Sequence, residues 1–491
     1  MHIVFAASEC VPYVKTGGLG DVIGALPKEL VKAGHKVTVY LPYYRSVHDY
    51  KVSHSTGEWK PVVRVPSITV TFDYFNRFAS VLDGGEVDGV QFYFIQCPEY
   101  FDRDGIYGHR DADFPDNAER FNLYCRAVLE ATKLLGVPDI FHAHDWQAAL
   151  IPILLGSTYS ADPVLGKVPS IFTIHNIGYQ GVFHKSTMVR LCLPWELFTM
   201  DNLEQYDEVN LLKGGIVYSD WVTTVSRTYA KEIQTAAYGF GMDTIVRRRA
   251  VHLSGILNGV DYGRWSPERD RHIVATYSAS DLSGKAKCRE DLLRLFHAQN
   301  VAPETPIVAI ISRMAAQKGF DLIAGLGDEL AKEDMVMIVL GTGQAEYRDL
   351  FRGLANRFPG KFFIHLGYDG ALAHKIEAGA DIFLMPSHYE PCGLNQIYSL
   401  KYGTVPVVRA TGGLEDTVEQ CDLKLGTGTG FKFLEYTPVA LQHALREALA
   451  AYKNRPQWEK IMRNGMAKDF SWEKIVPEYV EVYESLLPQP E

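Results

Sequence analysis

The sequence has little cysteine, and its cysteines lie far apart. Seven cysteines stand in 491 residues, and no two of them form a Cys-x-x-Cys pair or a zinc-finger spacing. This scarcity excludes a disulfide-stapled fold and predicts reduced thiols. No segment approaches the roughly 20 consecutive apolar residues that span a membrane, and the first residues carry neither a signal-peptide core nor an arginine-rich presequence. We therefore expect a cytoplasmic protein without a membrane partner.

Positive charge is also in short supply. The 49 lysines and arginines stand against 59 acidic residues, which gives a formal net charge of −10. Because the field of such a chain repels polyanions, we expect no nucleic-acid partner, although a local basic pocket is still allowed. Apolar residues make up 47% of the chain and charged residues 22%, which is ordinary globular composition and excludes a disordered or fibrous protein.

Short segments rich in Val and Ile alternate with amphipathic segments along most of the chain. A strand at 2–8, a helix from the glycine-rich segment 15–20 to about residue 33, and a strand at 36–41 form a first βαβ unit. Further strands are expected at 92–96, 139–143, 169–174, 222–225, 307–311, 335–340, 362–366, 381–385 and 405–408. This alternation is typical of parallel sheets with helices on both faces, so the sequence predicts an α/β fold.

The alternation is interrupted once, between residues 261 and 307. This stretch holds Trp265, Pro267 and a polar segment near 278–285. A boundary at 260–266 would divide the chain into two α/β domains of similar size, as its length allows. A last amphipathic helix with aromatic residues is expected at 475–487, and the pattern assigns it to neither domain.

Two loops carry cations next to predicted helix starts. The segment Lys15–Gly20 presents a lysine and bare backbone N–H groups where anions bind, but it matches neither the G-x-G-x-x-G fingerprint nor a P-loop. Its glycines indicate either a phosphate site or only a tight strand-to-helix turn. Arg313 and Lys318 follow the strand at 307–311 and suit a diphosphate, with a solvated basic turn as the alternative.

Histidines stand at the ends of two predicted strands. His142 and His144 alternate along one strand and therefore share a face, and His175 ends the next strand. A metal site is one interpretation, but no third ligand stands at helical spacing nearby. The other interpretations are a polar rim that binds a ligand or, for His142, a hydrogen-bonded position in the core.

The segment His-Tyr-Glu-Pro-Cys-Gly-Leu-Asn-Gln at 388–396 follows the strand at 381–385. Glu390 lies just before a predicted helix start at 393–395, where a carboxylate can accept sugar hydroxyls while the helix amides face a phosphate. Plain helix capping by Glu390 is the alternative. A thiol nucleophile at Cys392 would need a matched His or Asn signature, which the chain lacks.

Together these motifs resemble the ADP-glucose-dependent glycogen synthases of bacteria and cyanobacteria and the starch synthases of plants, which form glycosyltransferase family 5. The resemblance rests on Lys-Thr-Gly-Gly-Leu at 15–19, His-Ala-His-Asp-Trp at 142–146, His-Asn at 175–176, Leu-Asn-Gly-Val-Asp at 257–261, Ser-Arg and Gln-Lys-Gly within 312–319, and Glu-Pro-Cys-Gly-Leu at 390–394. It extends to Asp-Phe-Ser-Trp at 469–472, essentially the full chain. The asparagine at position 395 resembles the starch-synthase-like form, whereas many bacterial glycogen synthases have threonine there.

The resemblance implies a GT-B fold, in which two Rossmann-like domains face a deep cleft. Residues 1–262, joined by the terminal helix at 470–491, would form the acceptor-side domain, and residues 263–469 the ADP-glucose domain. The implied reaction transfers glucose from ADP-glucose to the non-reducing end of an α-1,4-glucan or maltooligosaccharide with retention of configuration. No cofactor and no metal are implied.

The resemblance also implies roles for individual residues. Glu390, His175 and Asp145 would be catalytic, and Tyr107 and Glu9 would face the acceptor. Tyr368 would stack on adenine. The residues implied to bind ADP-glucose are Lys15, Gly18, Asn258, Arg313, Lys318, Tyr368, Glu390, Cys392, Gly393, Leu394 and Asn395.

Three alternatives stay open on the sequence alone. One is another retaining transferase of similar fold, such as a sucrose-type or UDP-glucose enzyme. The second is a phosphorylase, which would need a lysine-bound pyridoxal phosphate. The third is a non-catalytic glucan-binding protein that retains a relic site.

Overall fold

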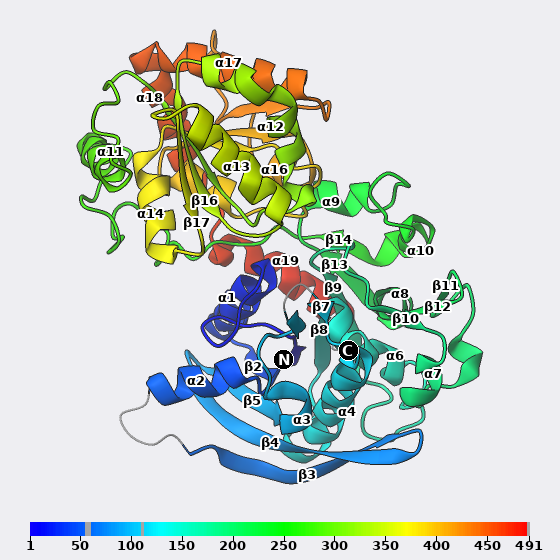
Figure 1. Cartoon of the computed structure of the whole chain (residues 1–491). Coiled ribbons are helices and arrows are strands. Elements are labelled where there is room, and N and C mark those ends of the chain that lie inside the picture. The colour runs from blue at the N-terminus through cyan, green and yellow to red at the C-terminus, as the bar shows by residue number, and fades with distance from the viewer. Residues whose placement is uncertain (55–59, 110–111, 489–491) are drawn as a thin grey trace. The chain divides into compact units, whose positions relative to one another are not determined.

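The computed structural model of the chain describes residues 1–54, 60–109 and 112–488. These residues form two compact α/β units (Figure 1). Unit 1 contains Met1–Val225, Ala230–Gly259 and the chain from Trp472 on, and unit 2 contains Ser226–Tyr229 and Val260–Ser471. The main division thus falls between residues 259 and 260, and the chain returns to unit 1 at residue 472.

Unit 1 is built on a nine-stranded sheet with the order β14-β13-β9-β8-β1-β2-β5-β4-β3. Its strands are β1 (His2–Ala6), β2 (Lys36–Pro42), β3 (Val62–Phe72), β4 (Phe75–Val87), β5 (Val90–Gln96), β8 (Ile140–His144), β9 (Ser170–Ile174), β13 (Trp221–Thr224) and β14 (Leu253–Gly255). The strands from β14 to β5 are parallel, and β4 and β3 continue the sheet antiparallel. The smaller strands are β6 (Gly108–His109), β7 (Ala112–Asp113), β10 (Val182–His184), β11 (Glu204–Gln205) and β12 (Glu208–Asn210).

Helices cover the sheet of unit 1. They are α1 (Gly18–Lys32), α2 (Arg45–Ser53), α3 (Pro98–Phe101), α4 (Asn117–Leu135), α5 (Asp145–Ala148), α6 (Leu150–Leu155), α7 (Thr187–Arg190), α8 (Leu211–Tyr218), α10 (Asp243–Arg248) and α19 (Trp472–Ser485), with short 3₁₀ turns at Trp195–Leu197 and Ala250–His252. Helix α9 (Arg227–Glu232) begins in the short segment assigned to unit 2. The last helix α19 packs beside α1 (Figure 1, red beside blue), so the terminal helix belongs to unit 1.

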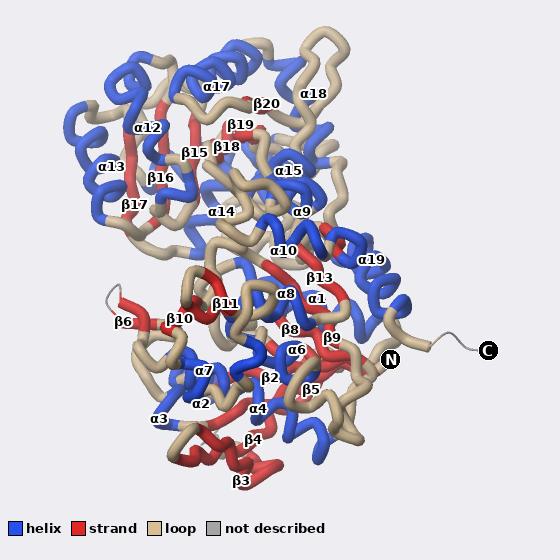
Figure 2. Tube along the Cα trace, turned by 90° about the vertical axis from the view of Figure 1, so that its right-hand side faces the viewer, coloured by secondary structure: helices blue, strands red, loops and turns tan. Residues whose placement is uncertain are grey.

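Unit 2 contains a six-stranded parallel sheet with the order β17-β16-β15-β18-β19-β20 (Figure 2). Its strands are β15 (Ile307–Ile311), β16 (Val336–Gly341), β17 (Phe362–Leu366), β18 (Ile382–Met385), β19 (Val405–Arg409) and β20 (Phe431–Phe433). Its helices are α11 (Ser283–Leu295), α12 (Phe320–Leu326), α13 (Ala345–Arg357), α14 (Gly370–Gly379), α15 (Asn395–Lys401), α16 (Gly412–Thr417), α17 (Pro438–Tyr452) and α18 (Arg455–Met466), with 3₁₀ turns at Ala316–Lys318 and Gly327–Lys332.

The two faces of the unit 2 sheet are buried in separate hydrophobic cores. Along β15, Val308 and Ile310 join the core under α12, α13 and α17, while Ile307 and Ala309 join the core under α11 and α14. This alternation follows from the two-residue period of a strand. Because both faces of the sheet are covered, the residues on both faces of the strand are apolar. The strand sequence therefore lacks the alternation of apolar and polar residues that marks a half-buried strand.

The predicted strand at 2–8 is too long. The structure ends β1 at Ala6, where the Tyr124 hydroxyl accepts from Ala7 N at 2.9 Å and lies 2.7 Å from Tyr40 O and 3.0 Å from Ala7 O. The antiparallel pair β3 and β4 was not predicted, and neither were β14 and β20. Most residues of β3 are exposed, so its sequence lacks the apolar run that marks the parallel strands.

Within residues 1–54, 60–109 and 112–488, each helix is too short or too polar to cross a lipid bilayer.

Candidate active site

The sequence-predicted residues of unit 1 lie at one edge of its sheet. Strands β1, β8 and β9 are parallel neighbours, with Ala6 beside Ala143 and His144 beside Thr173. Their carboxyl ends therefore meet at the same edge, and each is followed by a predicted site residue: Glu9, Asp145 and His175. Ligands of open α/β sheets bind at this edge.

Glu9 and Tyr107 hold the glycine-rich loop that precedes α1. The Glu9 carboxylate is buried and accepts hydrogen bonds from Thr16 N at 2.6 Å, Gly17 N at 3.0 Å and Tyr107 Oη at 2.7 Å. Tyr107 Oη also lies 2.7 Å from Ser8 Oγ. The structure thus gives both residues a positioning role in the loop, which the resemblance did not indicate.

Two glycines of this loop, Gly17 and Gly18, have no steric cause among the described residues. A Cβ atom placed on either would meet no heavy atom of those residues within 4 Å, and neither has a positive φ. A tight turn therefore does not require them, which argues against the alternative of a purely structural turn. Lys15 lies beside this open surface, with its Nζ paired to Asp21 at 2.7 Å. Because these glycines have no side chains, a ligand at this surface can approach the backbone N–H groups of the loop closely.

Asp145 adopts a strained backbone conformation next to His175. Its φ is +55°, a left-handed value that is uncommon for non-glycine residues. Asp145 Oδ1 accepts the backbone N–H of His175 at 2.8 Å. The pKa of Asp145 is raised to about 7, chiefly by burial and also by the Glu9 carboxylate, while hydrogen bonds from the backbone of His175 and Asn176 partly offset the rise. The carboxyl group is therefore poised between its two protonation states near neutral pH.

The raised pKa of Asp145 predicts a pH-dependent stability. A carboxyl group that holds its proton more tightly in the folded state stabilises that state, and this contribution is fully present at pH values below the ordinary pKa of 3.8. The contribution is lost as the pH rises to about 7. We expect the unfolding free energy of the wild type, relative to Asp145→Asn, to fall by up to about 1 kcal/mol per pH unit between pH 5 and 7. Urea unfolding of both proteins followed by circular dichroism measures it. A difference that grows with pH would contradict the shift.

The histidines of β8 share a face, as the alternation predicted, but they do not line an open rim. The rings of His142 and His144 lie 4.1 Å apart and both residues are fully buried. His142 Nδ1 lies 2.8 Å from Tyr483 Oη of α19, and His142 Nε2 lies 2.6 Å from Thr173 Oγ1. The interpretation of His142 as a rim residue is therefore wrong, and its position in the core is the alternative that holds.

Asn258 follows β14 at the same edge of the unit 1 sheet. Its side chain is buried, and among the described residues its Oδ1 has no hydrogen-bond partner. A buried acceptor without a donor costs free energy unless a ligand or water satisfies it. Asn258 therefore has the unused capacity that a ligand-binding residue needs.

In unit 2, the central feature is an ion pair between Lys318 and Glu390. Lys318 Nζ lies 2.6 Å from Glu390 Oε2, which also accepts from Ser387 Oγ at 2.9 Å. Lys318 comes from the loop after β15 and Glu390 from the loop after β18, and these strands are parallel neighbours. Glu390 is 5% exposed, so the pair is shielded from water on the carboxylate side.

Glu390 is not a helix cap. Helix α15 begins at Asn395 with Leu394 at its N-cap position and no side-chain cap. The Asn395 side chain instead donates from Nδ2 to Ile311 O at 2.7 Å, which joins this segment to the end of β15. Gly393 has a φ of +70°, and its neighbour Cys392 is buried. The capping alternative is therefore excluded.

The backbone around Glu390 rests on two glycines that the sequence did not single out for the site. Gly412 and Gly413 start α16, and a Cβ on either would overlap the carbonyl oxygen of Glu390 or Cys392. Gly413 N donates to Glu390 O at 3.1 Å. The sequence Thr-Gly-Gly-Leu occurs at 16–19 in unit 1 and again at 411–414 in unit 2. The glycines of the two copies have different causes, because Gly17 and Gly18 face open space. Only the fold distinguishes them.

The remaining predicted residues of unit 2 follow the same sheet edge. Arg313 lies two residues after the end of β15 and is exposed, and Tyr368 follows the edge strand β17 with 82% of its surface exposed. The tyrosine ring is therefore open to a stacking partner. Among the described residues, no three His, Cys, Asp or Glu side chains are arranged to hold a metal ion.

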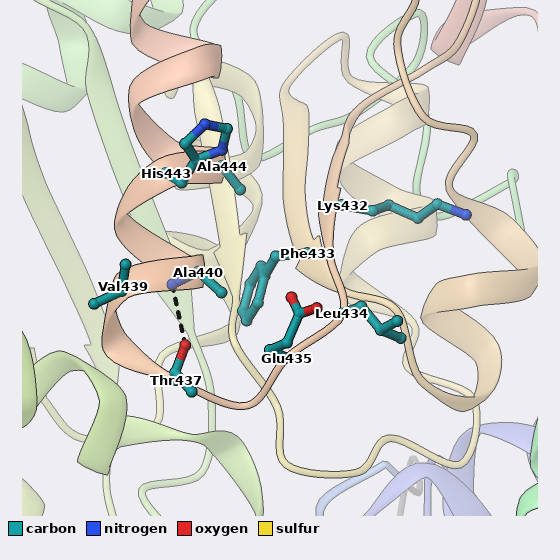
Figure 3. A pocket seen from close by; sticks show the side chains of 9 residues that line it. All are labelled: Lys432, Phe433, Leu434, Glu435, Thr437, Val439, Ala440, His443 and Ala444. Carbon is teal, nitrogen blue, oxygen red and sulfur yellow. Dashed lines mark hydrogen bonds between the residues drawn. The ribbon is translucent and has the colours of Figure 1, made fainter.

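A pocket of about 520 Å³ opens elsewhere on unit 2, between β20 and the start of α17 (Figure 3). Phe433 points from the strand toward the helix, and Thr437 Oγ1 accepts the N–H of Ala440 at 3.2 Å. Its lining is largely apolar and contains none of the predicted site residues. We therefore do not assign the reaction to this pocket.

The two α/β units, each built on a largely parallel sheet, match the architecture of glycosyltransferases with the GT-B fold. A family model described as glycosyl transferases group 1 matches residues 294–465. Sucrose-phosphate synthase from Thermosynechococcus elongatus shares this fold, with a TM-score of 0.61 at 15% identity over 99% of this chain and 98% of its own. The predicted fold class is thus confirmed.

More similar proteins narrow the class to a family. A family model described as the starch synthase catalytic domain matches residues 2–248. The glycogen synthase of Koribacter versatilis is 57% identical over 99% of this chain and 98% of its own, and that of an Anaeromyxobacter species is 45% identical over 99% of both. The catalytic domain of starch synthase IV from Arabidopsis thaliana, bound to ADP and acarbose, has a TM-score of 0.89 and 32% identity over 99% of both chains. The chain belongs to the glycogen synthase and starch synthase family of retaining glycosyltransferases.

Proposed function

We propose that this protein transfers glucose from ADP-glucose to the non-reducing end of an α-1,4-glucan or maltooligosaccharide, with retention of configuration. The Lys318–Glu390 pair carries the proposal, because it joins a cation suited to phosphate with a carboxylate suited to sugar hydroxyls at 2.6 Å. The ADP in the Arabidopsis starch synthase IV structure supports the choice of nucleotide.

The charges that develop during retaining transfer match the proposed residues. The bond between glucose C1 and the diphosphate oxygen breaks with its electron pair going to ADP, which leaves positive charge on the sugar. Arg313, Lys318 and Lys15 would stabilise the diphosphate, together with the Gly18 amide and the amides around Leu394 and Asn395. The acceptor hydroxyl forms the new bond to C1 and passes its proton to an oxygen of the diphosphate.

The glucose and the base would be held by the other predicted site residues. Glu390, the backbone of Cys392 and Gly393, His175, Asn258 and Asp145 would contact the glucose, and the open ring of Tyr368 would stack on adenine. Glu390 would accept glucose hydroxyls and stabilise positive charge at C1, without forming a covalent bond. Tyr107 and Glu9 would act on the acceptor side through the loop that they hold.

A donor comparison tests the proposal. We expect initial rates on a defined maltooligosaccharide to be higher with ADP-glucose than with UDP-glucose, and the radiolabel to appear in a product longer by one α-1,4-linked glucose. A preference for UDP-glucose would favour another retaining transferase. Glucose 1-phosphate formed on adding inorganic phosphate would indicate a phosphorylase. Tight glycogen binding without incorporation would indicate a non-catalytic protein.

The proposed compartment is the cytoplasm. All seven cysteines are free thiols, and five of them are buried. Free thiols persist where the redox potential is reducing. The substrates proposed here, a nucleotide sugar and a glucan, are the partners expected in that compartment.

A further inference from the structure

We propose that His144 is a positioning residue for this reaction: it donates from Nδ1 to Nε2 of His175 and thereby leaves the His175 proton on Nδ1, where it donates to a hydroxyl of the transferred glucose. The inference rests on the proposed function, since it assigns a use to His175 within that reaction. It concerns unit 1 alone, and His144 itself touches no substrate.

The two rings meet at the carboxyl ends of neighbouring strands. His144 is the last residue of β8, and His175 directly follows β9. Nδ1 of His144 lies 3.0 Å from Nε2 of His175, which is hydrogen-bond distance. In a pair of neutral imidazoles, one of these facing nitrogens must hold the proton and the other the lone pair. Which one holds it decides what His175 can offer a ligand.

The surroundings of His144 distinguish between the two possible positions of the proton that the rings share. His144 is 0% exposed and packs against two rings, Phe5 at 5.4 Å in a stacked arrangement and His142 at 4.1 Å. Its other nitrogen, Nε2, is buried and has no hydrogen-bond partner among the described residues. That nitrogen bears either an unsatisfied N–H group or an unsatisfied lone pair.

The burial of Nε2 favours one arrangement. If His175 donated to His144, the His144 proton would sit on Nε2 and leave a buried N–H group without an acceptor. Proteins tolerate a buried donor without an acceptor less often than a buried acceptor with spare lone pairs. His144 therefore carries its proton on Nδ1 and donates it. His175, which is only partly buried, then presents an N–H group at Nδ1 to a ligand.

Both rings are neutral near pH 7. Burial lowers the pKa of His175 to about 3 and holds the pKa of His144 well below its usual value, to which the nearby His142 and His175 also contribute. His175 is therefore a neutral hydrogen-bond donor, and with its proton on Nδ1 it cannot accept a proton there. The carboxyl of Asp145 fixes the His175 backbone at 2.8 Å and so completes the orientation of the ring.

Two amide variants of His144 separate this role from packing. The amide nitrogen of asparagine occupies the place of histidine Nδ1, whereas that of glutamine occupies the place of Nε2. We expect His144→Asn to keep kcat/KM for ADP-glucose within about threefold of wild type, and His144→Gln to lose about tenfold. Equal losses in the two variants, with equal thermal midpoints, would show that only ring packing matters and would overturn the proposal.

Donor analogues then identify the hydroxyl. In a series of ADP-glucose analogues that each lack one glucose hydroxyl, one analogue should cost the wild type about tenfold in kcat/KM but cost His144→Gln less than about threefold. His142→Asn, which alters the same strand without touching His175, is the control and should show the wild-type pattern. If no analogue loses its penalty in His144→Gln, the proposal fails, even though transfer from ADP-glucose stands.

Ring ¹⁵N NMR tests the proton positions without any substrate. In protein labelled at the histidine ring nitrogens, the His175 signals are identified by their loss in His175→Asn. We expect a protonated, pyrrole-type Nδ1 and a pyridine-type Nε2, and the reverse would overturn the proposal. An absence of transfer by the wild type would overturn the proposed function, whereas the NMR signals would still show independently whether His144 donates to His175.

Discussion

Glu390→Gln is expected to lower kcat for glucose transfer about 100- to 1000-fold, with a much smaller change in KM for ADP-glucose. The substitution keeps the shape of the side chain and one acceptor oxygen, replaces the other oxygen by an NH2 donor and removes the negative charge. In the proposed reaction that charge would face the sugar when positive charge develops at C1, so its loss should be felt mainly in the transition state. Initial rates over a range of ADP-glucose concentrations separate the two constants.

The loss of charge also affects Lys318, which Glu390 contacts at 2.6 Å. A matched control is available in the Glu415–Lys432 pair, which joins α16 to β20 at 2.9 Å with its lysine 18% exposed, close to the 20% of Lys318. Glu415→Gln should leave kcat within about twofold of wild type, because a partly exposed ion pair contributes little and touches no predicted site residue. If Glu390→Gln and Glu415→Gln behaved alike, Glu390 would have no role in the chemistry.

Lys318→Ala is expected to reduce kcat/KM for ADP-glucose about 100- to 1000-fold, with both constants affected. The lysine would neutralise the diphosphate in the bound donor and, more strongly, in the departing ADP. Its removal also leaves the buried Glu390 carboxylate without a counter-charge, which lowers stability. Calorimetry with ADP measures the binding part of the loss directly, and the remainder belongs to the transition state.

Two further variants make the assignment of Lys318 precise. Lys318→Arg keeps the charge but changes its shape, so it should recover only part of the loss. Lys432→Ala is the control for a lysine of similar exposure in a carboxylate pair. A double variant of Lys318→Ala with Glu390→Gln should lose less than the product of the single losses, because the two residues are in contact. Normal turnover by Lys318→Ala would refute the phosphate assignment.

Most of the parallel strands could be predicted from the sequence, because their apolar runs and the turns around them are local signals. The strands at 307–311 and 362–366 lie at the predicted residues. The pair β3 and β4 was missed because its residues alternate between exposed and buried without a continuous apolar run. The terminal helix was predicted, but its packing against α1 depends on contacts between segments more than 400 residues apart in the sequence.

The sequence proposes the candidate site as a set of residues, but it does not predict the contacts between them. Motif order identified Lys318 and Glu390, yet nothing in the sequence indicates that they form an ion pair. The residues that position the site were harder to predict. In the sequence, Gly412 and Gly413 resemble the glycines of any strand-to-helix turn, and only the structure shows the carbonyl oxygens that pack against them. The resemblance implied Glu9, and His144 was noted for its place on a predicted strand, whereas their partners come from other segments of the chain. Pairing across the sheet is a property of the fold rather than of local sequence.

The place of α19 in unit 1 has a consequence for the order in which the protein matures. The Tyr483 hydroxyl of α19 lies 2.8 Å from Nδ1 of the buried His142, and Tyr479 and Tyr483 are buried beside it. These residues leave the ribosome only after all of unit 2 has been synthesised. During translation, unit 1 therefore lacks the contacts of α19 with β8. Unit 2, whose residues are nearly contiguous, can complete its own hydrophobic cores first. Unit 1 is thus the first unit to be synthesised and the last to complete its packing.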